Sequence, residues 1–234
     1  MIRLLRSTLA LCILFPALLL AQNAPQAAPQ APHWEPDIRK FEEQDKINPP
    51  KPGVIIFAGS SSFARWNSLL DDMNGLNVIN RGFGGSQYTD LNQYAPRIVI
   101  AYRPAAVVVY EGDNDLADGS AKSPQSVANE AKGFARMVRS ASPQTWIYFL
   151  SIKPSKARWK EWSQMKSANS MIADFAKTQQ RVQYIDVASA MLDAQGHPRD
   201  ELFAEDGLHP NAKCYELWTS IIKPVLLKRE GTQK

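Results

Sequence analysis

From residue 54 onward, short apolar segments alternate with longer segments in which apolar residues recur at helical spacing. The apolar segments, most of them rich in β-branched residues, cover 54–58, 76–80, 105–110, 146–150 and 182–186. The helical patterns cover 62–73, 87–101, 124–140, 161–178 and 211–227. Parallel strands are joined by crossover helices and are buried on both faces, so they form nearly continuous apolar runs. The alternation therefore predicts an α/β domain with a five-stranded parallel sheet covered by helices on both faces.

The segments before this alternation differ from it in composition. A basic "MIRLLR" is followed by "LALCILFPALLLA", an apolar run too short to span a bilayer comfortably. Residues 1–21 are interpreted as a signal peptide, with a retained N-terminal membrane anchor as the alternative. Residues 22–33 are rich in Pro, Ala and Gln and predict an extended linker, followed by one domain over 34–230 with a short helix at 37–47. We therefore expect an exported protein, periplasmic or secreted, without stable membrane insertion after cleavage.

Charge and cysteine content argue against a nucleic-acid partner and against an intrachain disulfide. The formal net charge is +4, of which two positive charges lie in the leader, and the remaining excess is too small and scattered to indicate a nucleic-acid partner. The chain has two cysteines, and removal of the leader would leave Cys214 alone, so no intrachain disulfide is expected. Cys214 lies in a helical pattern and is predicted to be buried filler.

Polar and glycine-rich segments follow the predicted strands. They are "GSSS" (59–62), "NRGFGGS" (80–86) and "EGDNDLADG" (111–119), with "EDGLHPN" (205–211) just before the last helix. In an open parallel sheet, the loops at the carboxyl ends of the strands converge on the ligand crevice. We therefore expect these four segments to meet at one site.

A serine nucleophile in "GSSS" would need a base and an acid that orients the base. The chain has three histidines, of which His33 lies in the linker and His197 in a polar turn with no carboxylate in obvious register. His209 lies three residues after Asp206, a spacing that can direct both side chains to one side of a loop. The alternative for this segment is an ordinary turn before a helix.

The middle segments contain candidate donors for an oxyanion. Gly84 and Gly85 allow a backbone N–H to approach a substrate closely, although a simple strand-to-helix turn is the alternative. Asn114 can donate an N–H to a developing negative charge, whereas its ionised acidic neighbours cannot. A polar loop or a metal site is the alternative there, but the spacing is not that of a calcium loop and no His/Cys cluster accompanies it.

Together and in this order, the four segments resemble the Ser, Gly, Asn and His blocks of the SGNH hydrolases, the GDSL esterase/lipase family. The resemblance covers about 50–225. It implies Ser61 as the nucleophile, His209 as the base and Asp206 as the acid. It also implies an oxyanion hole formed by the N–H groups of Ser61 and Gly85 and the side chain of Asn114, with no metal or cofactor.

The resemblance further implies a flavodoxin-like three-layer α/β/α sandwich with strand order 2-1-3-4-5. One departure is that Ser60 stands where many members have aspartate. Ser62, and with it Ser60, is expected to cap the helix that follows.

The loop after the fourth predicted strand, "SIKPSKARWKEW" (151–162), is cationic and aromatic. Its position favours a substrate rim formed by Lys153, Arg158 and Trp159 over the same crevice. The alternative is a solvated loop whose tryptophans pack against the next helix. Because no long apolar insertion is present, we expect short acyl esters, acetyl first, on a small-molecule or glycan alcohol. The alternatives are a lysophospholipase- or thioesterase-type acylhydrolase, or a catalytically silent carbohydrate-binding protein on the same fold.

Overall fold

The structure is a computed structural model that describes residues 33–231. The expected signal peptide (1–21) and all of the expected linker except His33 therefore lie outside the described residues. Across 33–231, no helix combines the length and the apolar composition that crossing a membrane requires.

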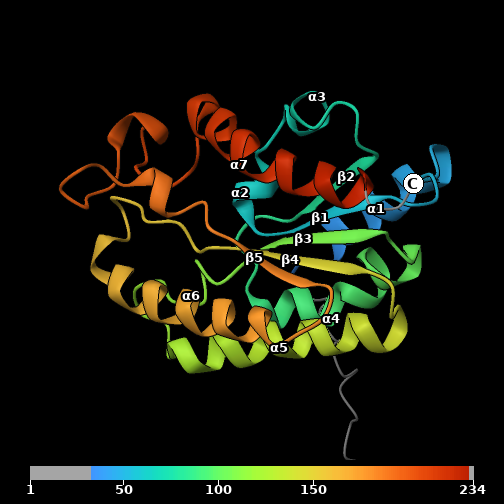
Figure 1. The fold of residues 1–234 in the computed structure, drawn as a ribbon, viewed down its shortest axis with the longest axis horizontal. Helices are drawn as coiled ribbons and strands as arrows, with labels where there is room; N and C mark the ends of the chain where they lie inside the picture. Colours follow the sequence, from blue (N-terminus) through green and yellow to red (C-terminus); the bar gives the residue numbers. More distant parts are fainter. Residues whose placement is uncertain (1–32, 232–234) are drawn as a thin grey trace, which may run out of the picture. The chain divides into compact units, whose positions relative to one another are not determined.

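The five expected strands form one parallel sheet in the order β2-β1-β3-β4-β5 (Figure 1). They are β1 (Ile55–Gly59), β2 (Val78–Gly82), β3 (Ala106–Tyr110), β4 (Trp146–Leu150) and β5 (Val182–Ile185). Gly59 pairs with both Gly82 and Tyr110, so the first three strands end at the same level. The predicted fold class and strand order are confirmed.

Helices cover both faces of the sheet, as Figure 1 shows. One layer contains α4 (Tyr88–Ile98), α5 (Pro124–Ala141) and α6 (Trp162–Lys177); the other contains α2 (Ser61–Ala64), α3 (Leu69–Asp72) and α7 (Ala212–Gly231). An N-terminal helix, α1 (Glu35–Ile47), contacts α4. Short 3₁₀ turns are η1 (Ile100–Tyr102), η2 (Trp159–Glu161), η3 (Ser189–Met191) and η4 (Asp200–Leu202).

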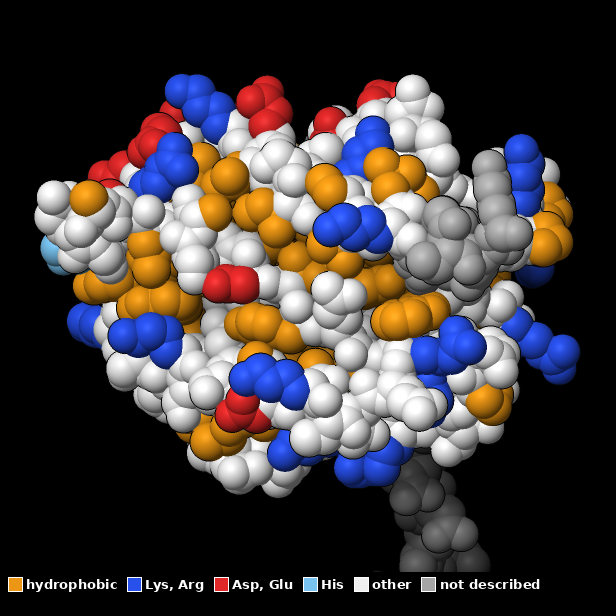
Figure 2. Space-filling model, in the orientation of Figure 1, with side chains coloured by type: hydrophobic (Ala, Val, Ile, Leu, Met, Phe, Trp, Pro, Cys, Tyr) orange, Lys and Arg blue, Asp and Glu red, His pale blue; other side chains and the backbone are white. Residues whose placement is uncertain are grey.

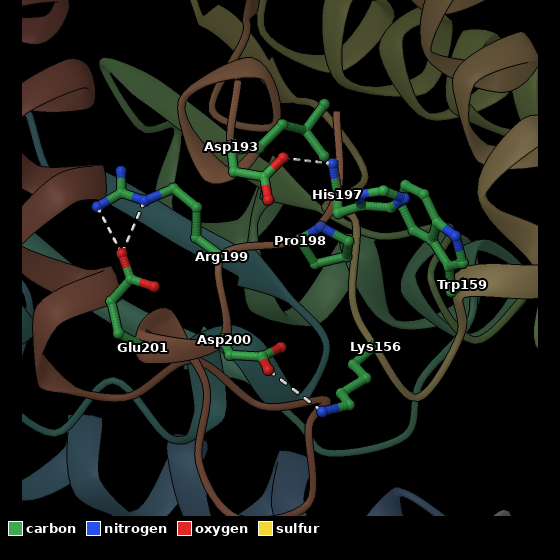
Figure 3. A pocket seen from close by; sticks show the side chains of 9 residues that line it. Lys156, Trp159, Asp193, His197, Pro198, Arg199, Asp200 and Glu201 are labelled. Atoms are coloured by element: carbon green, nitrogen blue, oxygen red, sulfur yellow. Dashed lines mark hydrogen bonds and ion pairs between the residues drawn. The ribbon is translucent and has the colours of Figure 1, made fainter. Parts of the chain in front are cut away.

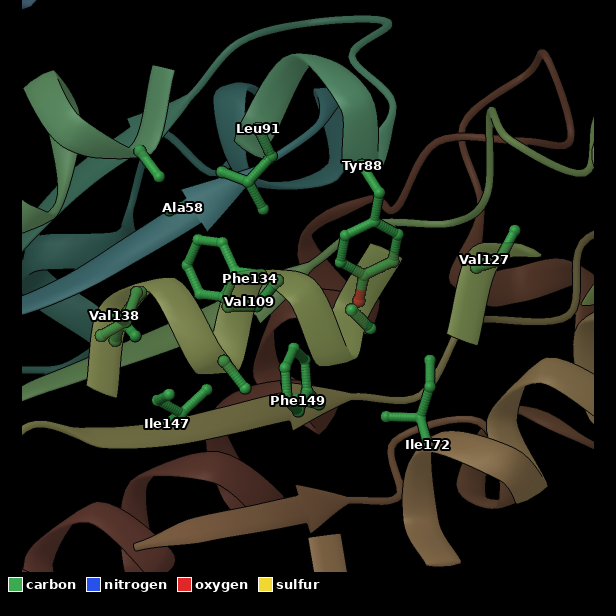
Figure 4. Close-up of a cluster of buried hydrophobic side chains, with 14 of the residues drawn as sticks. Ala58, Tyr88, Leu91, Val109, Val127, Phe134, Val138, Ile147, Phe149 and Ile172 are labelled. Atoms are coloured by element: carbon green, nitrogen blue, oxygen red, sulfur yellow. The ribbon is translucent and has the colours of Figure 1, made fainter. Parts of the chain in front are cut away.

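Alternating side chains of the strands enter two separate apolar cores. Val107 and Val109 of β3 pack with Phe134 of α5, whereas Val108 and Tyr110 belong to the core under α7. Figure 4 shows the first of these cores, with aromatic and aliphatic side chains interleaved between the sheet and its helices. In the orientation of Figure 1, apolar side chains run across the middle of the molecule and many charged ones lie toward its margins (Figure 2). Burial on both faces explains why the strand segments are almost wholly apolar.

Two expectations about local structure are wrong. The single helix expected over 62–73 is divided into α2 and α3, because the chain turns to bury Trp66, whose indole donates to Asp72 at 2.6 Å and stacks on Tyr215. The expected serine caps are also absent: Ser60 precedes α2 without a side-chain cap hydrogen bond, and Ser62 is a buried residue inside it.

Candidate active site

The end of β1 positions the serine. Gly59 lies so close to β3 that a Cβ atom there would be 2.0 Å from the carbonyl oxygen of Tyr110. Only glycine permits this approach, which lets the chain leave the sheet and begin α2 at Ser61. Ser61 is partly exposed, while the flanking Ser60 and Ser62 are buried. Of the three hydroxyl-bearing residues, Ser61 is therefore the most accessible.

Ser61, His209 and Asp206 form one hydrogen-bonded chain. His209 Nε2 lies 3.0 Å from Ser61 Oγ, although the two residues are separated by 148 positions in the sequence. His209 Nδ1 lies 2.6 Å from Asp206 Oδ2. The other oxygen of Asp206 accepts the backbone N–H groups of Leu208 and His209, each at 2.9 Å. The aspartate thus fixes both the loop and the imidazole.

Electrostatics determine the imidazole tautomer. The backbone N–H of His209, together with its ring, holds the pKa of the Asp206 carboxyl well below its ordinary value. Asp206 is therefore a carboxylate at neutral pH and can only accept a hydrogen bond. The proton of neutral His209 must then lie on Nδ1, which leaves the lone pair of Nε2 facing Ser61.

The glycine and asparagine blocks lie beside the serine. A Cβ atom at Gly84 would be 3.8 Å from the Cβ of Ser61. Gly85 has a φ of +83°, a left-handed conformation that other residues adopt at a cost. The side-chain amide of Asn114 donates to the carbonyl of Ser86 at 2.8 Å. All the residues expected in the triad and the oxyanion hole are therefore brought to one end of the sheet.

An aromatic side chain from the N-terminal segment lies beside the glycine block. The ring of Trp34 would be 3.1 Å from a Cβ atom at Gly85, and it packs edge to face on Phe83 with centroids 5.7 Å apart. The helix that Trp34 precedes is fixed by Glu35, which binds Arg97 of α4 at 2.8 Å. No sequence pattern predicts this contact, because Trp34 is far from every motif of the site.

Two of the three residues expected in the substrate rim, Lys153 and Arg158, form ion pairs inside the protein. Lys153 is only 1% exposed and pairs with Asp113, so it does not lie on a rim. Arg158 also pairs with Asp113 and donates to Asn114 Oδ1 at 2.9 Å. Burial would raise the pKa of Asp113, but the two cations outweigh it and lower that pKa to about 2. Both cations are therefore part of an internal network of charges.

Trp159 packs against the next helix, as one of the two alternatives expected, and its role in a substrate rim stays a prediction. It stacks on Trp162 of α6 with ring centroids 6.2 Å apart, and it also lines a cavity of about 780 Å³. Figure 3 shows this cavity between the loop after β4 and the segment 192–201, with His197 beside Trp159 and an ion pair between Lys156 and Asp200. The backbone N–H of Ala157 donates to the carbonyl of Gly207 at 3.1 Å, so the cavity adjoins the loop that carries Asp206 and His209.

Two further acidic residues of the 111–119 segment, Glu111 and Asp115, have partners inside the protein, whereas Asp118 is exposed. Burial raises the pKa of Glu111 well above its ordinary value, and its carboxyl shares a 2.5 Å hydrogen bond with the Ser86 hydroxyl. Asp115 pairs with Lys122 at 2.7 Å. Within 33–231, no group of three His, Cys, Asp or Glu side chains has metal-binding geometry. Cys214 is buried, which raises the pKa of its thiol to about 12, as expected for filler rather than a nucleophile.

Residues 48–217 match the model of the GDSL-like Lipase/Acylhydrolase family. The match extends over most of the chain, and the protein belongs to this family. The resemblance of the four sequence blocks to this family is thereby confirmed. A search of curated proteins finds no match.

Solved structures with the same fold include a GDSL-like lipase from Bacteroides thetaiotaomicron, with 18% identity and a TM-score of 0.71 over 82% of this chain and 98% of that one. An acetyl esterase mutant with acetate ion has 16% identity and a TM-score of 0.63 over 77% and 99% of the two chains. A carbohydrate esterase family 3 structure from Talaromyces cellulolyticus has 17% identity and a TM-score of 0.61 over 75% and 96%. At these identities the likeness is one of fold.

Proposed function

We propose that this protein is a serine esterase that forms an acyl-enzyme on Ser61. The observation that carries the proposal is the hydrogen-bonded chain from Ser61 through His209 to Asp206, with distances of 3.0 Å and 2.6 Å. A hydroxyl, an imidazole and a carboxylate in this order are the groups that nucleophilic acyl transfer requires. Membership in a family of lipases and acylhydrolases supports an ester as the substrate.

The first half-reaction transfers the acyl group to the enzyme. Ser61 Oγ attacks the ester carbonyl while His209 Nε2 takes the hydroxyl proton, and the carbonyl electron pair moves onto oxygen. The backbone N–H groups of Ser61 and Gly85 and the amide of Asn114 are the proposed donors to this oxyanion. When the carbonyl re-forms, the bond to the alcohol breaks and the alcohol leaves with the proton from His209.

The second half-reaction returns the free enzyme. A water molecule attacks the acyl carbon while His209 takes its proton, and the carboxylic acid leaves as that proton returns to Ser61. Asp206 stays ionised throughout and stabilises the imidazolium that forms in each half-reaction. Besides the ester and water, the proposed cycle uses only side chains and backbone N–H groups of this chain.

For the substrate we propose short acyl esters, acetyl first, on a carbohydrate alcohol. The cavity beside the His209 loop is lined by the indole of Trp159 and otherwise largely by charged and polar residues. An aromatic face with hydrogen-bonding groups around it suits a sugar ring better than a long hydrocarbon chain. The fold relatives described as an acetyl esterase and a carbohydrate esterase are compatible with this choice.

We further propose that the protein acts outside the cytoplasm, on the basis of the basic and apolar leader over 1–21. Amino-terminal sequencing of the mature protein tests this. A terminus at or near Gln22 in an exported fraction is the expected result, and an intact leader in the membrane fraction contradicts it.

The test of the nucleophile is the Ser61→Ala variant, with Ser62→Ala as a matched control that loses a neighbouring hydroxyl. With p-nitrophenyl acetate, the wild type and the control are expected to show a burst and to gain the mass of one acetyl group. The Ser61→Ala variant is expected to show neither. Acetylation or near-normal turnover in this variant contradicts the proposed function, and absence of esterase activity in the wild type favours a silent carbohydrate-binding protein.

A further inference from the structure

The side-chain amide of Asn114 is held from both sides. Its oxygen accepts from Arg158 Nη2 at 2.9 Å, and its nitrogen donates to the carbonyl of Ser86 at 2.8 Å. An amide nitrogen carries two hydrogens, so the bond to Ser86 leaves one for a third partner. These two contacts therefore determine which end of the amide faces the substrate.

Reversal of the amide would be unfavourable on both sides. An asparagine amide can rotate by half a turn with little change in shape, exchanging its oxygen and nitrogen. The oxygen would then face the Ser86 carbonyl, and the N–H groups would face the guanidinium of Arg158. An acceptor would stand where the reaction needs a donor, and it would repel a developing oxyanion.

Arg158 is itself held rigidly. Its other terminal nitrogen, Nη1, donates to Asp113, which also accepts from Lys153 Nζ and, at 2.9 Å, from the hydroxyl of Tyr110. The side chains of Asp113 and Lys153 are 5% and 1% exposed. Because Asp113 and Asn114 are consecutive, one planar guanidinium with two parallel donors can bind both.

We propose that Arg158 is a positioning residue for the oxyanion hole, which fixes the Asn114 amide with its nitrogen toward the substrate. This inference rests on the proposed function. It replaces the role of a substrate-binding cation for Arg158, because both terminal nitrogens of the guanidinium are already bound inside the protein. The ion pair with Asp113, buttressed by Lys153, keeps the guanidinium in place.

The first test compares Arg158→Met and Arg158→Lys with p-nitrophenyl acetate, a neutral ester without an anionic group. We expect kcat to fall by about tenfold or more and KM to change by less than about twofold, because the lost interaction matters when charge develops on oxygen. Arg136→Met, on the exposed surface of α5, is the matched control and should leave both constants unchanged. A raised KM with an unchanged kcat would assign Arg158 to substrate binding and overturn the proposal.

The second test is a double-mutant cycle with Asn114→Ala. If Arg158 acts through Asn114, Arg158→Met should lower kcat by about tenfold in the wild type but by less than about twofold in the Asn114→Ala background. Effects that multiply independently would contradict the proposal. Should Arg158→Met fail to fold, Arg158→Lys, which keeps a cation beside Asp113, completes the same cycle.

The kinetics of these variants distinguish failure of the positioning role of Arg158 from failure of the proposed function. Loss of activity in Ser61→Ala and Asn114→Ala, with normal kcat in both Arg158 variants, would overturn only the positioning role. Normal activity in Ser61→Ala would contradict the nucleophile itself.

Discussion

The candidate site has two halves, each organised by one aspartate: Asp206 contacts His209, and Asp113 contacts Arg158 beside Asn114. The first aspartate is partly exposed and the second is buried. The side chain of Asp206, which orients the base, is 43% exposed, and two of its partners are backbone N–H groups of its own loop. The side chain of Asp113, which holds Arg158, is 5% exposed, and two of its partners are cations about forty residues away along the chain. Both carboxylates have a lowered pKa, from local hydrogen bonds in one case and from buried cations in the other.

The difference follows from what each half does during the reaction. In the proposed mechanism the imidazole beside Asp206 gains and loses a proton in every cycle, and hydration of the exposed Asp206 carboxylate limits the cost of that change in charge. The charges around Asp113 stay constant, so they can be buried without a penalty during turnover. Variants of the exposed half should therefore affect chiefly rate, and variants of the buried half should affect both rate and stability.

The largest expected effect is in the exposed half. His209→Ala should lower kcat by about three orders of magnitude or more, because the proposed base is removed, while the free energy of unfolding changes by about 1 kcal/mol or less. Asp206→Asn should be comparable or milder, since it disturbs the tautomer and leaves the base in place. Steady-state kinetics and urea unfolding on the same samples check both. A large loss of stability in His209→Ala would contradict the prediction that variants of the exposed half act chiefly on rate.

The buried half should respond chiefly in stability. Asp113→Asn should lower the free energy of unfolding by about 3–5 kcal/mol at pH 7, because Lys153 is left buried without its carboxylate. Asp174→Asn, in an exposed pair with Lys177, is the control and should change it by less than about 1 kcal/mol.

The pH dependence sharpens this prediction. The pKa of Asp113 is about 2, against an ordinary value of 3.8, so its ionised form stabilises the fold fully above about pH 4. That contribution is lost as the pH falls through about 2. The stability gap between wild type and Asp113→Asn should therefore narrow on acidification from pH 6 to pH 3, as measured by urea unfolding. A gap that widens would contradict the assigned charge of Asp113.

Asn114 lies between the two halves and should show a smaller effect on rate. Asn114→Ala should lower kcat by about a hundredfold, with a much smaller change in KM, because its donor is used chiefly in the transition state. Initial rates over a range of ester concentrations measure both constants. The role fails if only KM changes, or if a chelator removes the activity.

The smallest expected effect concerns the cavity that Trp159 lines. Trp159→Ala should lower kcat/KM by about threefold to tenfold for acetylated sugars and leave p-nitrophenyl acetate nearly unaffected. An ester series from about two to twelve carbons, run beside it, tests the proposed acyl preference. Equal kinetics on acetylated sugars would remove Trp159 from the substrate site, and faster turnover of esters with about eight or more carbons would rule out the short-acyl preference.

The sequence was sufficient for the sheet because burial on both faces leaves a strong local signal in 54–58 and 105–110. It was less informative at β2, which was expected over 76–80 and extends over Val78–Gly82. β2 is an edge strand, and its polar Asn80 donates a 2.7 Å hydrogen bond to the carbonyl of Phe63. A pattern of apolar residues does not reveal that a polar side chain in a strand has such a partner. His209 and Asp206 were identifiable because they are close in sequence and histidines are few.

The burial of Lys153 could not be predicted, because its partner is distant in the sequence. Lysine and arginine are usually exposed, so a cationic loop predicts a rim. Lys153 forms a buried ion pair with Asp113, which lies on a different loop. No local sequence pattern connects the two residues. The burial that raises the pKa of Glu111 is likewise a property of the folded chain and leaves no local signal in the sequence.

His209 follows Ser61 by 148 positions, so the two residues are synthesised at different times. At about 5–20 residues per second, synthesis would deliver His209 about 7–30 s after Ser61. Throughout that interval the growing polypeptide carries Ser61 without the proposed general base. If the proposed triad is correct, catalytic competence begins only when the loop before the last helix reaches the end of the first strand.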